Sequence, residues 1–271
     1  MARKQTIEVP MRVRPAPPVL LAVPLTVLLA ACAAPEAEPR EEASPAVRVG
    51  ADGEAPPAVT APDEPPVRAD INAPYLSARL DVDDLAEGFS AESREVFAAR
   101  GAVTAALGIA PGDTVADIGA GTGIYLAPFS RAVGPAGEVV AIDISERLVD
   151  YLAAYAAEEG LANVRAALGA DADTGLAPDS VDLAFTSDVY HHFARPMAMN
   201  AHLYEAIRPG GRFAVLDFRK GEGAPAWIAR HVRADMAGVI AEVTAAGFAY
   251  EGEVAVEGLE DNYLIVFRKP G

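Results

Sequence analysis

The sequence predicts an α/β protein with a doubly wound, mostly parallel sheet of seven strands, helices on both faces and a C-terminal antiparallel strand. Short apolar runs alternate with helical patterns from about residue 90 to residue 246. A cluster of glycines directly follows the first apolar run, which is typical of a strand–turn–helix unit. Two alternating segments, residues 248–256 and 262–268, end the chain and favour an antiparallel pair at one edge of the sheet.

The regular elements follow from these patterns in chain order. Ser145 is a good N-cap for a helix, and Pro196 suits the first turn of another. Pro128 lies inside a helical pattern, where it should remove a hydrogen bond or kink the helix. Strands before the closing pair are predicted over residues 114–118, 138–143, 163–168, 180–186 and 212–218. Helices are predicted over residues 90–107, 122–133, 146–159, 196–207 and 231–246.

The composition excludes several kinds of partner and site. A net charge of −17 and a pI near 4.6 argue against nucleic acid as a partner, because that needs patches of Lys and Arg. Cys32 is the single cysteine of the chain, so the region after it has no disulfide, cysteine-based zinc site or catalytic cysteine. With only four histidines in the sequence, we expect no His-rich metal site and no bound metal.

The first stretch has the pattern of a secretory signal. Four basic residues precede an apolar run over residues 19–31, which is too short to span a bilayer comfortably. The run ends in Leu29-Ala30-Ala31-Cys32, which resembles a bacterial lipobox. This resemblance implies a signal peptide over residues 1–32, a lipid on Cys32 that anchors the chain to a membrane of the cell envelope, and a periplasmic domain. The alternative is an ordinary signal peptide with an incidental cysteine.

Residues 33–74 are rich in Ala, Pro and Glu and have few large apolar side chains. Such a segment buries too little apolar area to offset the entropy of ordering, so we expect a disordered tether. The folded domain is then expected over residues 75–271.

The most informative motif surrounds the end of the first predicted strand. Asp117 is followed by Gly119, Gly121 and Gly123, and Asp143 ends the next predicted strand, 20 residues beyond Gly123. Glycines let the backbone approach a nucleotide-like ligand closely, and the second acid is spaced to meet a ribose diol. The dinucleotide pattern G-x-G-x-x-G needs a glycine where this chain has Ile124, so the spacing disfavours an NAD-dependent oxidoreductase.

This D-x-G-x-G-x-G arrangement resembles motif I of the class I S-adenosylmethionine (SAM) methyltransferases. The segment Thr186-Ser-Asp188-Val-Tyr190-His191-His192-Phe193 resembles the corresponding region of the ubiquinone/menaquinone C-methyltransferases. The resemblance covers roughly residues 80–270 and implies a Rossmann-like fold, a SAM-dependent methyltransferase domain and SAM as the cofactor. The cofactor-binding residues that it implies are Asp117, Gly119, Ala120, Gly121, Gly123, Asp143, Ile144, Asp171, Ala172 and Asp188.

The resemblance also implies roles for individual side chains. Asp117 is expected to position the amino group of SAM, and Asp143 is expected to accept the ribose hydroxyls. Asp171 is expected to meet the exocyclic amine of adenine, with Asp173 as its competitor and Ala172 supplying a backbone N–H to the ring. Each assignment has a purely structural alternative. The glycine loop could be a simple strand-to-helix turn, Asp143 could be an acid at a helix N-terminus, and the loop with Asp171 and Asp173 could be a solvated acidic loop.

His191 and His192 are the candidate catalytic residues, because a histidine can act as a general base near neutral pH. Adjacent side chains point in different directions, so at most one of the two is expected to act. The alternative is that the histidines only line the site. His231 is expected to open a later helix and is a further candidate for lining the acceptor pocket.

These observations predict methyl transfer from SAM to a small-molecule acceptor by a membrane-anchored enzyme. SAM is made in the cytoplasm, whereas the N-terminal pattern predicts export. An exported, non-enzymatic ligand-binding lipoprotein on a methyltransferase fold is therefore the alternative.

Overall fold

The computed structural model describes residues 64–68 and 70–271. The predicted signal peptide, Cys32 and most of the predicted tether lie outside the described residues. None of the helices in the described part of the chain has the length and apolar character that a membrane span requires.

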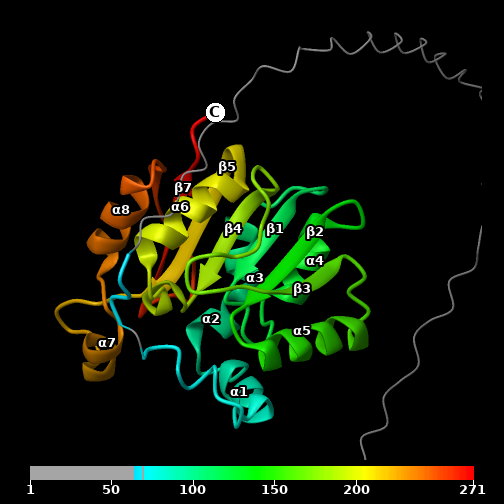
Figure 1. Ribbon diagram of the computed structural model, residues 1–271, viewed down its shortest axis with the longest axis horizontal. Helices are drawn as coiled ribbons and strands as arrows, with labels where there is room; N and C mark the ends of the chain where they lie inside the picture. The colour runs from blue at the N-terminus through cyan, green and yellow to red at the C-terminus, as the bar shows by residue number, and fades with distance from the viewer. Residues whose placement is uncertain (1–63, 69) are drawn as a thin grey trace, which may run out of the picture. The chain divides into compact units, whose positions relative to one another are not determined.

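A seven-stranded sheet forms the centre of the folded region (Figure 1). Its strand order is β3-β2-β1-β4-β5-β7-β6. The first five strands pair in parallel, whereas β7 runs antiparallel to both β5 and β6. The predicted fold class is thereby confirmed, and the expected antiparallel pair lies at one edge of the sheet, with β6 outermost and β7 between β5 and β6. The strands are β1 (Thr114–Ile118), β2 (Glu138–Asp143), β3 (Val164–Leu168), β4 (Val181–Ser187), β5 (Ile207–Phe218), β6 (Ala249–Val254) and β7 (Asn262–Arg268).

Two apolar cores cover the two faces of this sheet. On β5, Phe213 and Val215 enter one core, while Ala214 and Leu216 enter the other, because successive side chains of a strand point to opposite faces. Helices α2 to α5 pack in one core, and α6 and α8 pack in the other. The helices are α1 (Val82–Phe89), α2 (Glu95–Ala98), α3 (Arg100–Ala106), α4 (Leu126–Val133), α5 (Glu146–Glu158), α6 (Pro196–Ala206), α7 (Ala226–His231) and α8 (Met236–Ala245), with a one-turn 3₁₀ helix η1 (Tyr190–His192).

Two predicted helices are interrupted in the structure. The helix expected over residues 90–107 is instead the short pair α2 and α3, and α1 precedes it. The helix expected over residues 231–246 is also two helices. Val232 leaves the helical conformation after α7, and Asp235 caps α8 by accepting a hydrogen bond from the backbone N–H of Gly238 at 2.8 Å. His231 therefore ends α7 rather than opening a helix.

The capping and turn residues explain three smaller differences. Helix α4 begins only at Leu126, because Gly123 at φ +80° still belongs to the preceding turn. Pro128 is thus in its first turn, where the missing N–H has no helical partner to lose. Ser145 stands at the N-cap of α5, but its side chain makes no capping bond. Strand β5 begins at Ile207, before its predicted start at residue 212, and residues 208–211 form an irregularity in it, with Gly210 at φ +78°.

Packing on the domain begins before the expected boundary at residue 75. Glu64 accepts a hydrogen bond from the backbone N–H of Ala198 at 2.9 Å, which satisfies a free donor in the first turn of α6. The Val67 N–H donates to the carbonyl of Ala194 at 2.8 Å. Residues of this early segment are thus held by polar contacts with distant segments, which a search for apolar periodicity does not detect.

Candidate functional site

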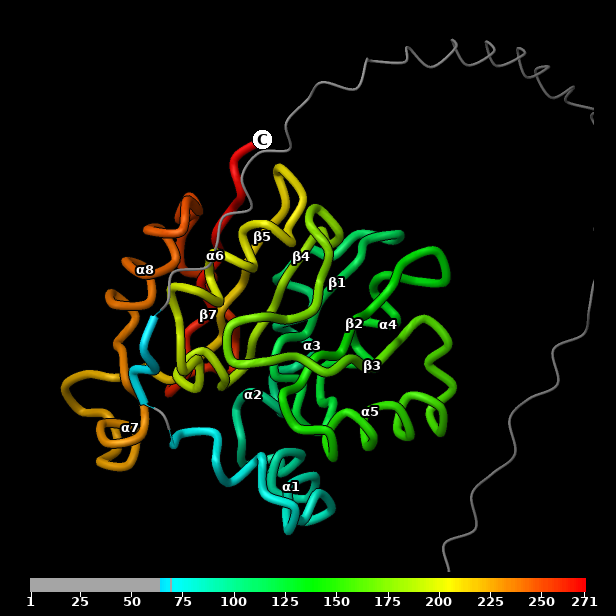
Figure 2. The backbone as a smooth tube through the Cα atoms, viewed as in Figure 1, coloured from blue at the N-terminus to red at the C-terminus, as the bar shows by residue number. Residues whose placement is uncertain are grey.

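A pocket lies at the carboxyl ends of β1, β2 and β4, where parallel strands deliver their loops to one edge of the sheet. Figure 2 shows the segment between residue 70 and α2 running along this same edge. Of the predicted site residues, Gly123, Ala172 and His191 do not line the pocket. Those that do are Asp117, Gly119, Ala120, Gly121, Asp143, Ile144, Asp171, Asp188 and His192.

The glycine loop after β1 is held against β2. The N–H groups of Gly119 and Ala120 both donate to the carbonyl of Ile142, at 2.8 and 2.9 Å. Gly119 has φ +72°, and a Cβ built there would lie 2.4 Å from Val189 Cγ1. The first glycine of the motif is therefore required both by its backbone conformation and by the close approach of the loop after β4.

Gly123 has a different role from the one predicted. A Cβ built there would lie 3.0 Å from Leu126 and 3.1 Å from Leu152. This glycine permits α4 and α5 to pack closely and does not face the pocket.

Asp143 joins two loops at the pocket wall. Its Oδ2 accepts from the N–H of Gly121 at 3.1 Å, and its Oδ1 accepts from the N–H of Ser145 at 3.0 Å. The side chain is buried, and burial raises the pKa of this carboxyl, while the backbone N–H groups of Ser145, Gly121 and Ile144 act in the opposite direction. Each oxygen keeps a lone pair that can accept a hydroxyl from a ligand.

Asp117 is the most perturbed acid of the site. The residue is only 3% exposed, and burial raises the pKa of its carboxyl to about 7, with the nearby charge of Asp143 adding to the rise. Within the described part of the chain, no group donates a hydrogen bond to this carboxylate. A buried acid that lacks a partner and lines a pocket is suited to bind a cationic group of a ligand.

The loop after β3 supplies two further acids to the pocket. Asp171 is paired with Arg195 at 3.3 Å, while Asp173 accepts from the N–H of Gly175 at 2.7 Å and lies 3.3 Å from His202. Both line the pocket, so the structure keeps both as candidates for the same role.

Asp188 turns the chain after β4. It has φ +52°, and its two oxygens accept from Arg94 and Asn262, each at 2.7 Å. Burial and the charge of Asp217 raise the pKa of Asp188 to about 6, while Arg94 opposes the rise. Both oxygens of Asp188 already have partners. This side chain therefore mainly holds the pocket wall in place and is less available than Asp117 to accept hydrogen bonds from a ligand.

The two candidate catalytic histidines lie in different surroundings. His191 is buried, and its Nδ1 lies 2.8 Å from Asp217 Oδ1. His192 lines the pocket, and its Nδ1 lies 3.2 Å from Asn72 Oδ1. Burial, followed by the charges of His191 and His231, lowers the pKa of His192 to about 3, so its imidazole is neutral at pH 7.

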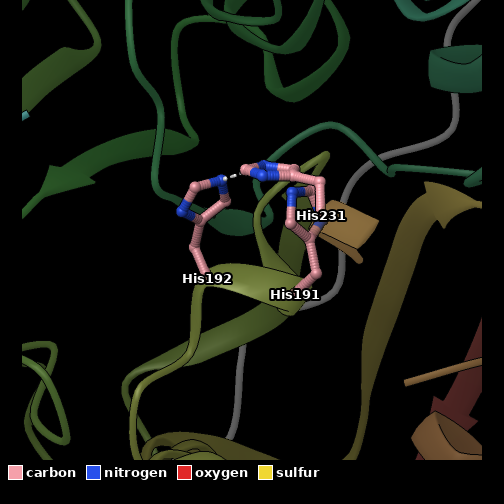
Figure 3. A group of neighbouring side chains, drawn as sticks. All are labelled: His191, His192 and His231. Carbon is pink, nitrogen blue, oxygen red and sulfur yellow. Dashed lines mark hydrogen bonds between the residues drawn. The ribbon is translucent and has the colours of Figure 1, made fainter. Parts of the chain in front are cut away.

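The rings of His191 and His192 nevertheless approach each other, with centroids 4.4 Å apart. The expectation that adjacent side chains diverge is therefore wrong for this tight 3₁₀ turn. His231 at the end of α7 meets both of them (Figure 3).

Sequence reasoning missed several residues of the pocket. Asn72 and Tyr75 come from the segment before α1, Phe89 is the last residue of α1, and Arg94 directly precedes α2. No motif marks them, because only the folding of this segment over the strand ends brings them to the site.

The charges of the pocket indicate the kind of ligand that it accepts. Five carboxylates line it, and Arg94 is the one basic side chain among its described lining residues. An acidic, partly apolar pocket that offers a free carboxylate and a glycine loop fits a ligand with a positive charge and a hydroxylated sugar. The acids that line it are Asp117, Asp143, Asp171, Asp173 and Asp188.

Comparison with known proteins gives this site a family context. A family model described as a methyltransferase domain matches residues 115–211. Nocamycin O-methyltransferase from Saccharothrix syringae is 39% identical over 105 residues, which are 39% of this chain and 38% of that protein. A ubiquinone/menaquinone biosynthesis C-methyltransferase from Pseudomonas putida is 35% identical over 118 residues, covering 42% of this chain and 44% of that protein.

A solved structure shows the same fold over a larger part of the chain. It is a SAM-dependent methyltransferase from Aquifex aeolicus, with a TM-score of 0.61, 25% identity, and coverage of 69% of this chain and 98% of that one. The curated relatives, by contrast, are matched over less than half of their length. The comparisons establish a Rossmann-like methyltransferase fold and support SAM as the cofactor.

Replacing Gly119 tests the close approach of the two loops. Gly119→Ala should lower the free energy of unfolding by about 2–4 kcal/mol, because a left-handed residue with a Cβ is strained and the new methyl group meets Val189. Gly112→Ala is the matched control, since Gly112 has φ +96° but open space around its Cβ position. It should cost only the backbone strain of about 1–2 kcal/mol. Equal losses in urea unfolding of the two variants would contradict the role given to the Val189 contact.

Proposed function

We propose that this chain is a SAM-dependent methyltransferase that acts on a small molecule. The observation that carries the proposal is that Asp117 and Asp143, near the carboxyl ends of the neighbouring strands β1 and β2, line one pocket together with a glycine loop in which a side chain at Gly119 would clash with Val189. SAM would supply a methyl group on a positively charged sulfur.

The residues of the pocket fit SAM by their chemistry. The Asp117 carboxylate would hold the ammonium group, since no other group in the described part of the chain satisfies it. The lone pairs of Asp143 would accept the ribose hydroxyls, while its bonds to Gly121 and Ser145 keep it in place. Asp171 or Asp173 would meet the adenine amine at the end of β3.

The acceptor would enter beside Tyr75 and His192, whose rings meet edge to face 5.4 Å apart. The main task of the protein there is to hold the acceptor in line with the methyl group, a proximity effect worth up to about 7–11 kcal/mol. His192 is neutral and offers a polar contact to the acceptor. A base role for His191 or His192 stays a prediction, because only an acceptor that must lose a proton needs one.

The identity of the acceptor does not carry over from the relatives. One of them is named as an O-methyltransferase and another as a C-methyltransferase. What they share with this chain is the region that would bind the methyl donor, so we restrict the proposal to a small-molecule acceptor.

We also propose that the chain is anchored in the cell envelope through a lipid on Cys32, as the lipobox-like sequence predicts. This part rests on the sequence alone. If the domain binds no SAM, the alternative of an exported ligand-binding lipoprotein takes its place.

The first prediction concerns Asp143. Asp143→Ala should weaken SAM binding by the full-length chain at least about 100-fold, because it removes two charge-assisted hydrogen bonds of about 1.5–3 kcal/mol each. Isothermal titration calorimetry with SAM and S-adenosylhomocysteine measures this loss. Asp150→Ala, on the exposed face of α5, is the control and should bind normally. Wild-type affinity in Asp143→Ala would contradict the cofactor assignment.

The second prediction concerns pH. The pKa of Asp117 is raised to about 7, and only the ionised carboxylate attracts the ammonium group, so SAM affinity should fall about tenfold between about pH 8 and about pH 6. The Asp117→Asn variant should bind more weakly and lose this slope. Asp188 titrates in the same range, but it is unchanged in the variant, so a slope that persists in Asp117→Asn would assign the effect to another group.

The third prediction concerns the anchor. When the full-length chain is expressed in a bacterial host, it should incorporate labelled palmitate and sediment with membranes. Cys32→Ser should abolish the label, whereas Ser44→Ala, in the predicted tether that follows, should retain it. Absence of label from the wild type, or its persistence in Cys32→Ser, would refute the lipidation.

A further inference from the structure

Three of the four histidines of the chain meet beside the pocket (Figure 3). His191 and His192 belong to η1, and His231 comes from the end of α7, 39 residues beyond His192. The Nε2 atoms of His192 and His231 are 3.3 Å apart, and one nitrogen from each of the three rings lies within 4.8 Å of the others. Nitrogens of three rings from two separate elements thus lie close together.

The second nitrogen of His191 has a partner that fixes its proton. Nδ1 of His191 lies 2.8 Å from Asp217 Oδ1, and the backbone N–H of His191 donates to Oδ2 of the same carboxylate at 3.0 Å. A carboxylate can only accept, so Nδ1 carries a proton, and in the neutral imidazole Nε2 has the lone pair that could bind an ion. A carboxylate behind a histidine is the usual outer partner of a metal-binding imidazole.

His192 is oriented in a similar way by Asn72. The Asn72 Nδ2 donates to the carbonyl of His192 at 3.2 Å, which assigns the amide so that Oδ1 faces His192 Nδ1, also at 3.2 Å. Nδ1 therefore carries the proton, and the lone pair of Nε2 points toward His231.

The spacing of the rings fits a metal ion. Two nitrogens bound to tetrahedral zinc at 2.0–2.1 Å lie about 3.3 Å apart, which is the separation of the Nε2 atoms of His192 and His231. An all-nitrogen ligand set suits zinc and disfavours magnesium or calcium, which prefer oxygen. The competing explanation is a hydrogen bond from a protonated His231 Nε2 to His192 Nε2, without any ion.

We propose that His191, His192 and His231 form a three-histidine site for Zn²⁺, with a fourth position open to the pocket that His192 lines. This departs from the expectation, drawn from the small number of histidines, that the chain has no His-rich metal site. His231 is only partly buried, which gives an ion a way in. Under the proposed function, on which this last step rests, the open position would bind an anionic oxygen of the acceptor next to the methyl group.

The test uses the full-length chain stripped of metal with EDTA. Zn²⁺ added in competition with a chromogenic chelator should bind at one ion per chain, with a dissociation constant on the order of 1 µM or tighter. Co²⁺ in its place should give the intense visible absorption of a tetrahedral ion. His231→Ala should weaken Zn²⁺ binding at least about 100-fold, and the outer-shell variant Asp217→Asn should weaken it about 10–100-fold.

His202→Ala is the matched control. It removes the remaining histidine, which contacts Thr174 at 2.7 Å and lies outside the cluster, so Zn²⁺ binding should not change. Circular dichroism checks that each variant is folded, and the Co²⁺ spectrum of the wild type does not depend on any variant. Failure of the folded wild type to bind Zn²⁺, or equal binding by His231→Ala, would overturn the proposal. SAM titration of the same samples separates the two proposals, since Zn²⁺ binding without SAM binding would leave the metal site standing and remove the methyltransferase function.

Discussion

The contact between Asp143 and the loop after β1 is the constraint on which the pocket depends. The two carboxylate oxygens of Asp143 accept hydrogen bonds from the N–H groups of Gly121 and Ser145, so one side chain holds together the loops that follow β1 and β2. Because these strands are parallel neighbours, both loops leave the sheet at the same edge, and no long connection is needed to bring them together. The same carboxylate is both a structural clamp and the acceptor that a ligand would meet. The observed structural role of this acid is therefore compatible with the binding role that we propose for it.

Burial of charge explains why the pocket favours a cation. Asp117, Asp143 and Asp188 each have a pKa raised mainly by burial, so the pocket holds carboxylates that ionise less readily than they would in water. Asp143 and Asp188 are compensated by hydrogen bonds, whereas Asp117 has no such donor within the described residues. A positively charged ligand would supply the missing partner, and its binding would restore the ionised state. The preference of the pocket for a cation is thus expected to be strongest at Asp117, the acid that has no hydrogen-bond donor among the described residues.

The sequence was sufficient where local patterns decide the structure. Strands β1 and β2 lie at their predicted residues, and the glycine loop lies where its spacing indicated, because a short apolar run next to a positive-φ turn has few alternatives. The sequence was not sufficient where distant contacts decide. The pocket wall formed by Asn72, Tyr75 and Arg94 depends on a segment without periodicity, and the insertion of β7 between β5 and β6 depends on pairing across the sheet. Neither has a local signature.

The turn after β4 links the acids of the pocket to the histidines of η1. Asp188, held at φ +52° by Arg94 and Asn262, directs the chain into η1, so its conformation sets where the two following histidines lie. Asp217, at the end of the adjacent strand β5, then holds His191 through both the backbone and the ring. Carboxylates with partners from separate strands and loops therefore determine the position of the imidazoles. For this reason, the small number of histidines in the chain did not reveal that the fold places three of them together. The parallel sheet edge gathers the histidines by the same geometry that gathers the acids.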